Sequence, residues 1–267
     1  MESIKRTGAK ARYEEDGFLV VPEVIFPNEL VENAVLGMDA IRRGEYDTGV
    51  PPRPSPWKPG DDPNLLCKIE QPQFASHAIR ELLNYPALGE WASAITGATG
   101  VQAWWIQLLY KPSAPEGVTL KTNVGWHQDR YYWGIWEEDS ELLTAWIALS
   151  EVEEDCGPMH FVRGSHQWGF RNEGDFFEQN LEGQKHGISV PEGANWEEVS
   201  GAIPKGGVTF HHKLTFHGSQ ANVSGRPRRS LAVHLRTQNS RPVENRREGL
   251  TEFIDDTTLC PVIYGKM

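Results

Sequence analysis

The strongest constraint on the fold comes from short apolar or aromatic runs that are separated by turn residues. These runs follow Gly100 and comprise Val101–Tyr110, Leu142–Leu149, Met159–Val162, Gly207–Phe210 and Leu231–Thr237. Runs of this length, with turn residues between them, are typical of the strands of an all-β sandwich or barrel with helices packed outside. The long insertions between the runs favour a jelly roll over a parallel α/β sheet.

The part of the chain before Gly100 predicts helices, one short strand and a long loop. Acidic residues, a glycine and an apolar run that ends at Pro22 indicate a helix end followed by a strand. Apolar residues at three-to-four spacing predict a helix from about Asn28 to Arg43, and a second helical region spans about His77 to Thr96. Between them, Gly44–Pro63 is rich in Gly, Pro and Asp, so we expect a loop that serves as a lid or wall of a site.

The chain shows no internal repeat and no convincing domain boundary. Its 267 residues are enough to bury one large core. We therefore predict a single domain over residues 1–267, with a helical N-terminal part over about 1–99 and a jelly-roll core over about 100–240.

Charge and cysteine content exclude several partners. With 37 acidic and 26 basic residues the net charge is −11, which argues against nucleic acid and anionic membranes as partners. No apolar run approaches the roughly 18 residues that a spanning helix needs, and the first residues lack a signal peptide's apolar stretch. Three widely spaced cysteines exclude a disulfide framework and suit a reducing cytoplasm. Glycine-rich nucleotide loops, His-Glu-x-x-His and Gly-x-Ser-x-Gly are absent from the sequence.

Three residues form a candidate metal-binding set. His127 and Asp129 are two positions apart, so on an extended chain they present a nitrogen and an oxygen to the same side. With the distant His217 they complete two histidines and one carboxylate, the facial triad of non-haem Fe(II) oxygenases, which leaves positions open for a co-substrate and O2. A turn aspartate beside a hydrogen-bonded histidine would produce the same local pattern, so His127 and Asp129 alone do not establish a metal site.

Arg228 adds a candidate anion-binding group after His217. The following strand alternates small residues at 230 and 232 with branched residues at 231 and 233, and Arg228 shares the side of the small ones. That side leaves room for a ligand whose carboxylate the guanidinium would hold with two hydrogen bonds. Ser219 lies close enough to His217 to add a hydroxyl to the same carboxylate. The alternatives are a surface pair, Arg228 and Arg229, and a serine that stabilises a turn.

The aromatic residues are unevenly distributed. Seven of the ten tryptophans fall between Trp104 and Trp168. Core packing explains several of them, but the contiguous Tyr131, Tyr132 and Trp133 cannot all face one core from an extended chain. We therefore expect these three residues to line a substrate pocket.

Taken together, these motifs resemble the phytanoyl-CoA dioxygenase family of Fe(II)/2-oxoglutarate oxygenases over nearly the whole chain. The matching segments are Tyr13–Pro22, His127–Asp129, Asp155–His166 and Phe210–Ser219, followed by Asn222, Ser224 and Arg228. The resemblance implies a mainly β fold, a double-stranded β-helix or cupin-like jelly roll with flanking α-helices. It also implies His127, Asp129 and His217 as the iron ligands and catalytic residues.

The same resemblance implies a set of residues that bind the co-substrate. Arg228 and Ser219 would hold the distal carboxylate of 2-oxoglutarate, and Trp146 would lie beside it. Lys68 resembles a lysine that some members use on 2-oxoglutarate, and Gln107 would line the same pocket.

The activity implied by the resemblance is hydroxylation of an aliphatic C–H bond of a small-molecule substrate. Fe(II), 2-oxoglutarate and O2 would be required, and 2-oxoglutarate would be decarboxylated to succinate and CO2. Retention of Asp129 favours hydroxylation, because halogenating relatives carry a small residue there. The alternative function is a non-catalytic, cupin-like jelly roll that binds a metal or another ligand.

Overall fold

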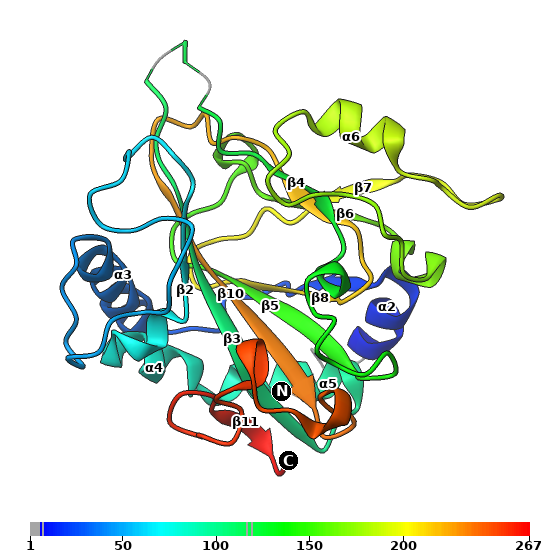
Figure 1. The fold of residues 1–267 in the computed structure, drawn as a ribbon. Coiled ribbons are helices and arrows are strands. Elements are labelled where there is room, and N and C mark those ends of the chain that lie inside the picture. Colours follow the sequence, from blue (N-terminus) through cyan, green and yellow to red (C-terminus); the bar gives the residue numbers. More distant parts are fainter. Residues whose placement is uncertain (1–5, 7, 116, 119) are drawn as a thin grey trace.

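The computed structural model describes residues 6, 8–115, 117–118 and 120–267, and within them the chain forms two antiparallel sheets that face each other (Figure 1). The main sheet has the strand order β1-β8-β5-β10-β3-β11, with β2 paired to β3 as well. Its strands are β1 (Phe18–Val20), β2 (Cys67–Glu70), β3 (Gly100–Lys111), β5 (Leu142–Ala148), β8 (Val208–His212), β10 (Arg228–Thr237) and β11 (Val262–Gly265).

The second sheet has the order β4-β9-β6-β7. It consists of β4 (Val124–His127), β6 (Met159–Val162), β7 (Glu198–Ser200) and β9 (His217–Ser219). Every run that was predicted as a strand from the sequence overlaps a strand of the structure, and the mainly β, jelly-roll prediction is confirmed.

The helices are α2 (Ala9–Asp16), α3 (Asn28–Arg42), α4 (His77–Leu83), α5 (Pro86–Thr96) and α6 (Leu181–Gly187). Short 3-10 turns cover Pro72–Phe74, Asp129–Tyr131, Glu154–Cys156, Ser165–Trp168, Val243–Asn245 and Gly249–Thr251. The helical region expected over 77–96 is two helices, because Pro86 disfavours helical backbone at Tyr85 and instead opens α5. In Figure 1, α3, α4 and α5 lie around the lower part of the main sheet, away from β4, β6 and β7.

The alternation along β10 separates a structural face of the main sheet from a functional one. Leu231, Val233 and Leu235 belong to the large core that also contains the buried faces of α3, α4 and α5. The intervening residues on β10 face the second sheet, where Ala232 packs in a smaller core. The helices therefore support the sheet from behind and leave its other face to build a site.

The main sheet also takes strands from outside the range 100–240 that we expected for the jelly-roll core. β1 and β2 come from the N-terminal part and β11 from the C-terminal end. The strand predicted before Pro22 corresponds to β1, whereas β2 and β11 were not predicted, because a strand of four residues carries little alternation. The three cysteines are buried and carry free thiols. No helix in the described part of the chain has the length and apolar character needed to cross a membrane.

Candidate active site

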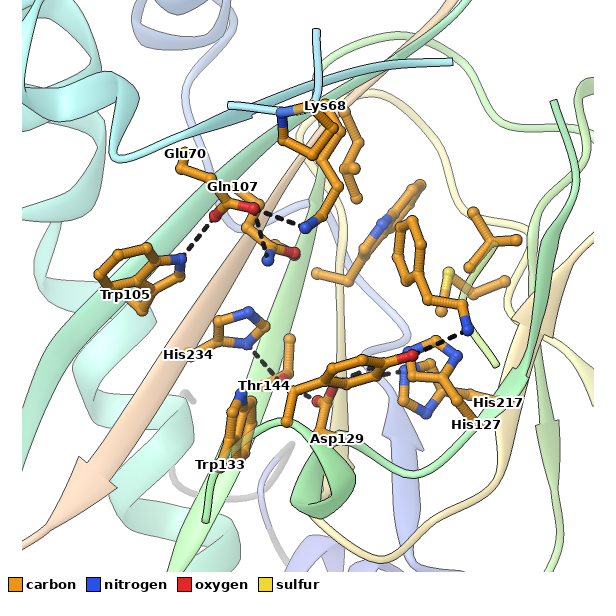
Figure 2. Close-up of a pocket in the computed structure, with 18 of the residues that line it drawn as sticks. Lys68, Glu70, Trp105, Gln107, His127, Asp129, Trp133, Thr144, His217 and His234 are labelled. Carbon is orange, nitrogen blue, oxygen red and sulfur yellow. Dashed lines mark hydrogen bonds and ion pairs between the residues drawn. The ribbon is translucent and has the colours of Figure 1, made fainter. Parts of the chain in front are cut away.

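A cavity of about 400 Å³ lies against the inner face of the main sheet, and the three candidate metal ligands lie in its wall (Figure 2). His127 ends β4 and His217 begins β9, and the two residues are direct partners in the register of these strands. Asp129 follows on a 3-10 turn. The side chains of all three are buried, and one donor atom from each lies within 4.8 Å of the others.

The hydrogen bonds of the two histidines direct one nitrogen of each toward the same point. Nδ1 of His127 lies 2.8 Å from the carbonyl of Gly125, and Nδ1 of His217 lies 2.9 Å from the carbonyl of Thr215. A carbonyl only accepts, so Nδ1 carries the hydrogen in both rings and Nε2 keeps its lone pair. Each Nε2 lies near Oδ1 of Asp129, at 3.8 Å from His127 and 3.7 Å from His217.

Asp129 is oriented by two residues that bind its other oxygen. Thr144 Oγ1 donates to Oδ2 at 2.6 Å, and His211 Nε2 lies 3.2 Å from the same atom. Oδ1 is therefore left for a metal ion. Burial acts to raise the pKa of the Asp129 carboxyl, but His217 and the hydrogen bond from His211 hold it well below its ordinary value. Burial lowers the pKa of both His127 and His217, which keeps them neutral, the form that binds a metal.

Arg228 lies fully buried in the wall of the same cavity and is only partly satisfied. Its Nη1 donates to the carbonyl of Gly157 at 2.6 Å, while Nε and Nη2 have no hydrogen-bond partner among the described residues. Burial lowers the pKa of Arg228 to about 9, so the site would gain from an anion beside it. The alternation predicted for this strand is confirmed, since Arg229 points to the opposite face and pairs with Asp39 at 3.1 Å.

Gly157 explains part of the Asp155–His166 motif. It has a φ of +65°, and a Cβ there would lie 2.2 Å from the carbonyl oxygen of Gln220. Glycine is therefore needed to bring this backbone close enough for its carbonyl to hold Arg228.

Ser219 lies away from the cavity wall and has a partner that the sequence did not indicate. Lys111 Nζ donates to the Ser219 hydroxyl at 2.7 Å and also to the carbonyl of Gln220. Lys111 is fully buried and pairs with Arg228 in the β3–β10 register. Burial, and then the charge of Arg228, lower the pKa of Lys111 well below its ordinary value. Ser219 thus accepts from a lysine that lies next to Arg228 in the sheet, and its direct contact with 2-oxoglutarate stays a prediction.

Trp146, Gln107 and Lys68 all line the cavity. The guanidinium carbon of Arg228 lies 5.1 Å from the centre of the Trp146 ring. Lys68 forms an ion pair with Glu70, Nζ to Oε1, at 2.5 Å, a partner that we did not predict. Figure 2 shows this pair and Gln107 on the wall opposite His127 and His217.

The three contiguous aromatic residues separate in space. Tyr132 and Trp133 line the cavity, whereas Tyr131 is 45% exposed and lies outside it, packed edge-on against Tyr132. The cause is the 3-10 turn at Asp129–Tyr131, which changes the direction of successive side chains. Phe176 joins the wall and donates its backbone N–H to the Tyr132 hydroxyl at 2.9 Å.

The loop Gly44–Pro63 contributes to the wall as expected. Its residues Pro54 and Pro56 line the cavity, next to β2. Backbone pairing between Arg53 and Glu70 ties the loop to that strand.

Comparison with known proteins agrees with this geometry. The family model described as phytanoyl-CoA dioxygenase matches residues 13–230, which is most of the chain. The chain belongs to the phytanoyl-CoA dioxygenase family. The matched range includes the candidate metal ligands and Arg228.

Two curated relatives resemble this phytanoyl-CoA dioxygenase family member along much of its length. A probable alpha-ketoglutarate-dependent hypophosphite dioxygenase from Stutzerimonas stutzeri is 30% identical over 189 residues, 66% of this chain and 59% of that protein. An ectoine dioxygenase from Bordetella parapertussis is 27% identical over 238 residues, 82% of this chain and 71% of that protein. The chain thus spans less than two thirds of the first relative, and the two relatives differ in their named substrates.

Solved structures show the same fold. The alpha ketoglutarate-dependent epimerase SnoN from nogalamycin biosynthesis superposes with a TM-score of 0.69 at 22% identity, covering 91% of this chain and 86% of SnoN. SnoN has also been solved with Fe3+, alpha ketoglutarate and nogalamycin RO, and that structure has a TM-score of 0.65, at 22% identity, over 91% of this chain and 87% of SnoN.

Several polar residues in and around the cavity were not predicted from the sequence. They are Glu70, Lys111, Thr144, His211 and His234. His211 stands in the motif Phe210–Ser219, and its alternation with Phe210 along β8 was the available indication. The others come from strands whose relative register a single sequence does not contain.

Proposed function

We propose that this protein is an Fe(II)- and 2-oxoglutarate-dependent dioxygenase that hydroxylates an aliphatic C–H bond of a small molecule. The observation that carries the proposal is the joint presence of two groups in one buried cavity. One is the set of three converging donor atoms on His127, Asp129 and His217. The other is the guanidinium of Arg228, which keeps unsatisfied donors.

These residues fit the groups that the proposal requires. Nε2 of both histidines and Oδ1 of Asp129 would hold Fe(II) on one face and leave its other positions open. Arg228 would bind the remote carboxylate of 2-oxoglutarate, over the small side chains of Ser230 and Ala232 on the same face of β10. Iron and 2-oxoglutarate, when bound, would supply the oxidising chemistry with O2, at the expense of 2-oxoglutarate decarboxylation to succinate and CO2.

The chain's own contribution is to orient these groups and to keep water away. The hydrogen bonds from Thr144 and His211 hold the Asp129 carboxylate in one orientation. Because Asp129 fills a metal position, the site suits hydroxylation and has no place for a halide. Buried walls from Trp133, Trp146 and Phe176 exclude bulk solvent from the reacting bond.

The cavity of about 400 Å³ suits a small-molecule substrate. We also propose a cytoplasmic location, because three buried cysteines remain thiols. Net charge argues against nucleic acid and membranes as partners.

The test is succinate formation by the purified protein with Fe(II), 2-oxoglutarate and O2, together with the melting temperature with and without these ligands. We expect 2-oxoglutarate and metal together to raise the melting temperature. We also expect succinate to form at a low rate when no substrate is present. The control is His217→Ala, which removes one of the three converging donor atoms and should show neither effect. Binding without turnover would favour the alternative, a non-catalytic metal-binding jelly roll, and the absence of both effects in the unmodified protein would exclude the dioxygenase proposal.

A further inference from the structure

A chain of hydrogen bonds runs from Asp129 through Thr144 to His234. Thr144 Oγ1 lies 2.6 Å from Asp129 Oδ2 and 2.8 Å from His234 Nδ1. The threonine hydroxyl has a single hydrogen, and an ionised carboxylate can only accept, so that hydrogen points to Asp129. Thr144 therefore accepts from His234, and Nδ1 of His234 carries a hydrogen.

This arrangement determines what His234 presents to the cavity. The imidazole is buried, and burial lowers its pKa to about 4, so it is neutral near pH 7. A neutral ring with hydrogen on Nδ1 keeps a lone pair on Nε2. No described residue bonds to Nε2, and His234 lines the cavity. Figure 2 shows the ring between Thr144 and the group formed by Glu70 and Gln107.

The ring is held in place by its neighbours. Its centre lies 4.8 Å from that of Trp133 and 5.8 Å from that of Trp104. Its backbone is on the inner strand β10, between Thr144 of β5 and Trp105 of β3. Because packing and the Thr144 bond restrict the ring, Nε2 is a preorganised hydrogen-bond acceptor.

The charged groups on the adjoining wall compensate one another. Trp105 Nε1 donates a hydrogen bond to Glu70 Oε2 at 2.5 Å, and Glu70 also forms an ion pair with Lys68. Gln107 Nε2 also lies 3.4 Å from Glu70, which leaves the Gln107 carbonyl oxygen as a second acceptor near the cavity. The wall opposite the metal ligands thus offers acceptors without an uncompensated charge.

We propose that Nε2 of His234 accepts a hydrogen bond from the substrate, which is a small alcohol or amine. The proposal rests on the dioxygenase function proposed above and adds the substrate class to it. A single hydroxyl group, that of Thr144, separates His234 from the carboxylate of Asp129. Nε2 points away from Thr144, so an O–H or N–H bound there would lie across the ring from Asp129, and C–H bonds farther along the same small molecule would reach the metal site.

The test uses matched compounds in which methylation removes the hydrogen-bond donor, and the His234 variants below separate this loss from the added size. Alcohols of about four to eight carbons, a size that fits the cavity, are compared with their methyl ethers. Primary amines are compared with their trimethylammonium counterparts. Succinate formation above the substrate-free rate is measured at several concentrations of each. We expect alcohols or amines to stimulate succinate formation, with kcat/KM about fivefold or more above that of the methylated partner, since one hydrogen bond of about 1 kcal/mol is lost on methylation.

Variants assign the effect to His234. His234→Phe keeps an aromatic ring between the tryptophans but removes the acceptor, and should lower the preference for the donor compound to about twofold or less. His234→Gln returns an amide oxygen near the position of Nε2 and should restore part of that preference. His186→Phe, on an exposed helix, is the matched control and should keep the full preference. A rise in melting temperature with metal and 2-oxoglutarate verifies that each variant is folded.

Three results would overturn the inference. They are equal stimulation by the methylated partners, an unchanged preference in His234→Phe, and the absence of stimulation by any alcohol or amine. In each case substrate-free succinate formation by the unmodified protein separates this failure from a failure of the dioxygenase function.

Discussion

Arg228 and Arg229 are adjacent in sequence, yet their guanidinium groups lie on opposite faces of the main sheet. Arg228 lines the cavity with two nitrogens to which no described residue bonds, whereas Arg229 pairs with Asp39 of α3. Both residues have the same charge and nearly the same position along the chain. A substitution at Arg228 therefore tests the site, and the same substitution at Arg229 is its matched control.

Replacement of Arg228 by Lys should weaken 2-oxoglutarate binding. Lysine keeps the charge but lacks the planar fork that forms two bonds to one carboxylate. Hydrogen bonds to charged groups are worth roughly 1.5–3 kcal/mol, so complete loss corresponds to about 10- to 150-fold in affinity. Titration of 2-oxoglutarate measures the effect, and Arg229→Lys should change it by less than about twofold. The opposite ranking of the two variants would contradict the assignment.

His217→Ala should abolish metal-dependent turnover. The variant removes one of three donor atoms that converge on the same point, and two remaining donors hold a metal weakly. The measurement is succinate formation together with the metal content after dialysis. His186→Ala is the control, because His186 lies on α6, where its ring contacts the carbonyl of Glu182 and is exposed. Full activity of the His217 variant would remove this residue from the site.

Thr144→Val should lower metal affinity about 10- to 100-fold, as is typical when a residue that orients a metal ligand is lost. Valine matches the shape of threonine but cannot donate to Asp129 Oδ2. Thr144→Ser retains the hydroxyl and should stay within about threefold of the unmodified protein. Calorimetric titration with Co(II) measures both variants. If valine and serine bind the metal equally well, Thr144 does not orient Asp129.

Gly157→Ala should destabilise the fold and weaken 2-oxoglutarate binding together. The added Cβ would lie 2.2 Å from the carbonyl of Gln220, so the backbone that holds Arg228 must move. Gly225→Ala is a matched control with a φ of +73° and open space around its Cβ. Positive φ alone costs about 1–2 kcal/mol, and the excess loss in Gly157→Ala measures the collision. Urea unfolding gives the free energies, and equal losses would exclude a special role for Gly157.

His212 should make the protein less stable in mild acid. Burial lowers its pKa to about 3, against about 6.5 in an unfolded chain. Between these values the unfolded state binds more protons than the folded state, so stability falls as the pH falls below about 6.5. From pH 7 to 5 this residue alone would cost about 2 kcal/mol of unfolding free energy.

His212→Asn tests that contribution. Asparagine does not titrate and can still accept from the backbone N–H of Leu214, as His212 Nδ1 does at 3.2 Å. Its unfolding free energy should fall less between pH 7 and 5 than that of the unmodified protein. Parallel curves for the two proteins would show that His212 is not a source of the acid sensitivity.

Side-chain directions that depend on one strand could be predicted from the sequence, whereas contacts that depend on the alignment of several strands could not. The direction of Arg228 follows from alternation within a single strand, and the sequence predicted it. The contacts of Asp129 with Thr144 and His211 depend on how β5, β8 and β10 are aligned, which no single sequence contains. Tyr131 does not point into the cavity as we expected, because the chain turns at Asp129 instead of continuing as a strand.

The cavity joins two kinds of wall. Its floor consists of strand residues such as Thr144, Trp146 and Arg228, which the helices hold from behind. Another part of its lining consists of exposed loop residues such as Pro54 and Phe177. Loops accept insertions and substitutions that inner strands do not. Changes in these loops would therefore alter which small molecules fit the cavity, while the strand residues that would hold the metal and 2-oxoglutarate keep their places.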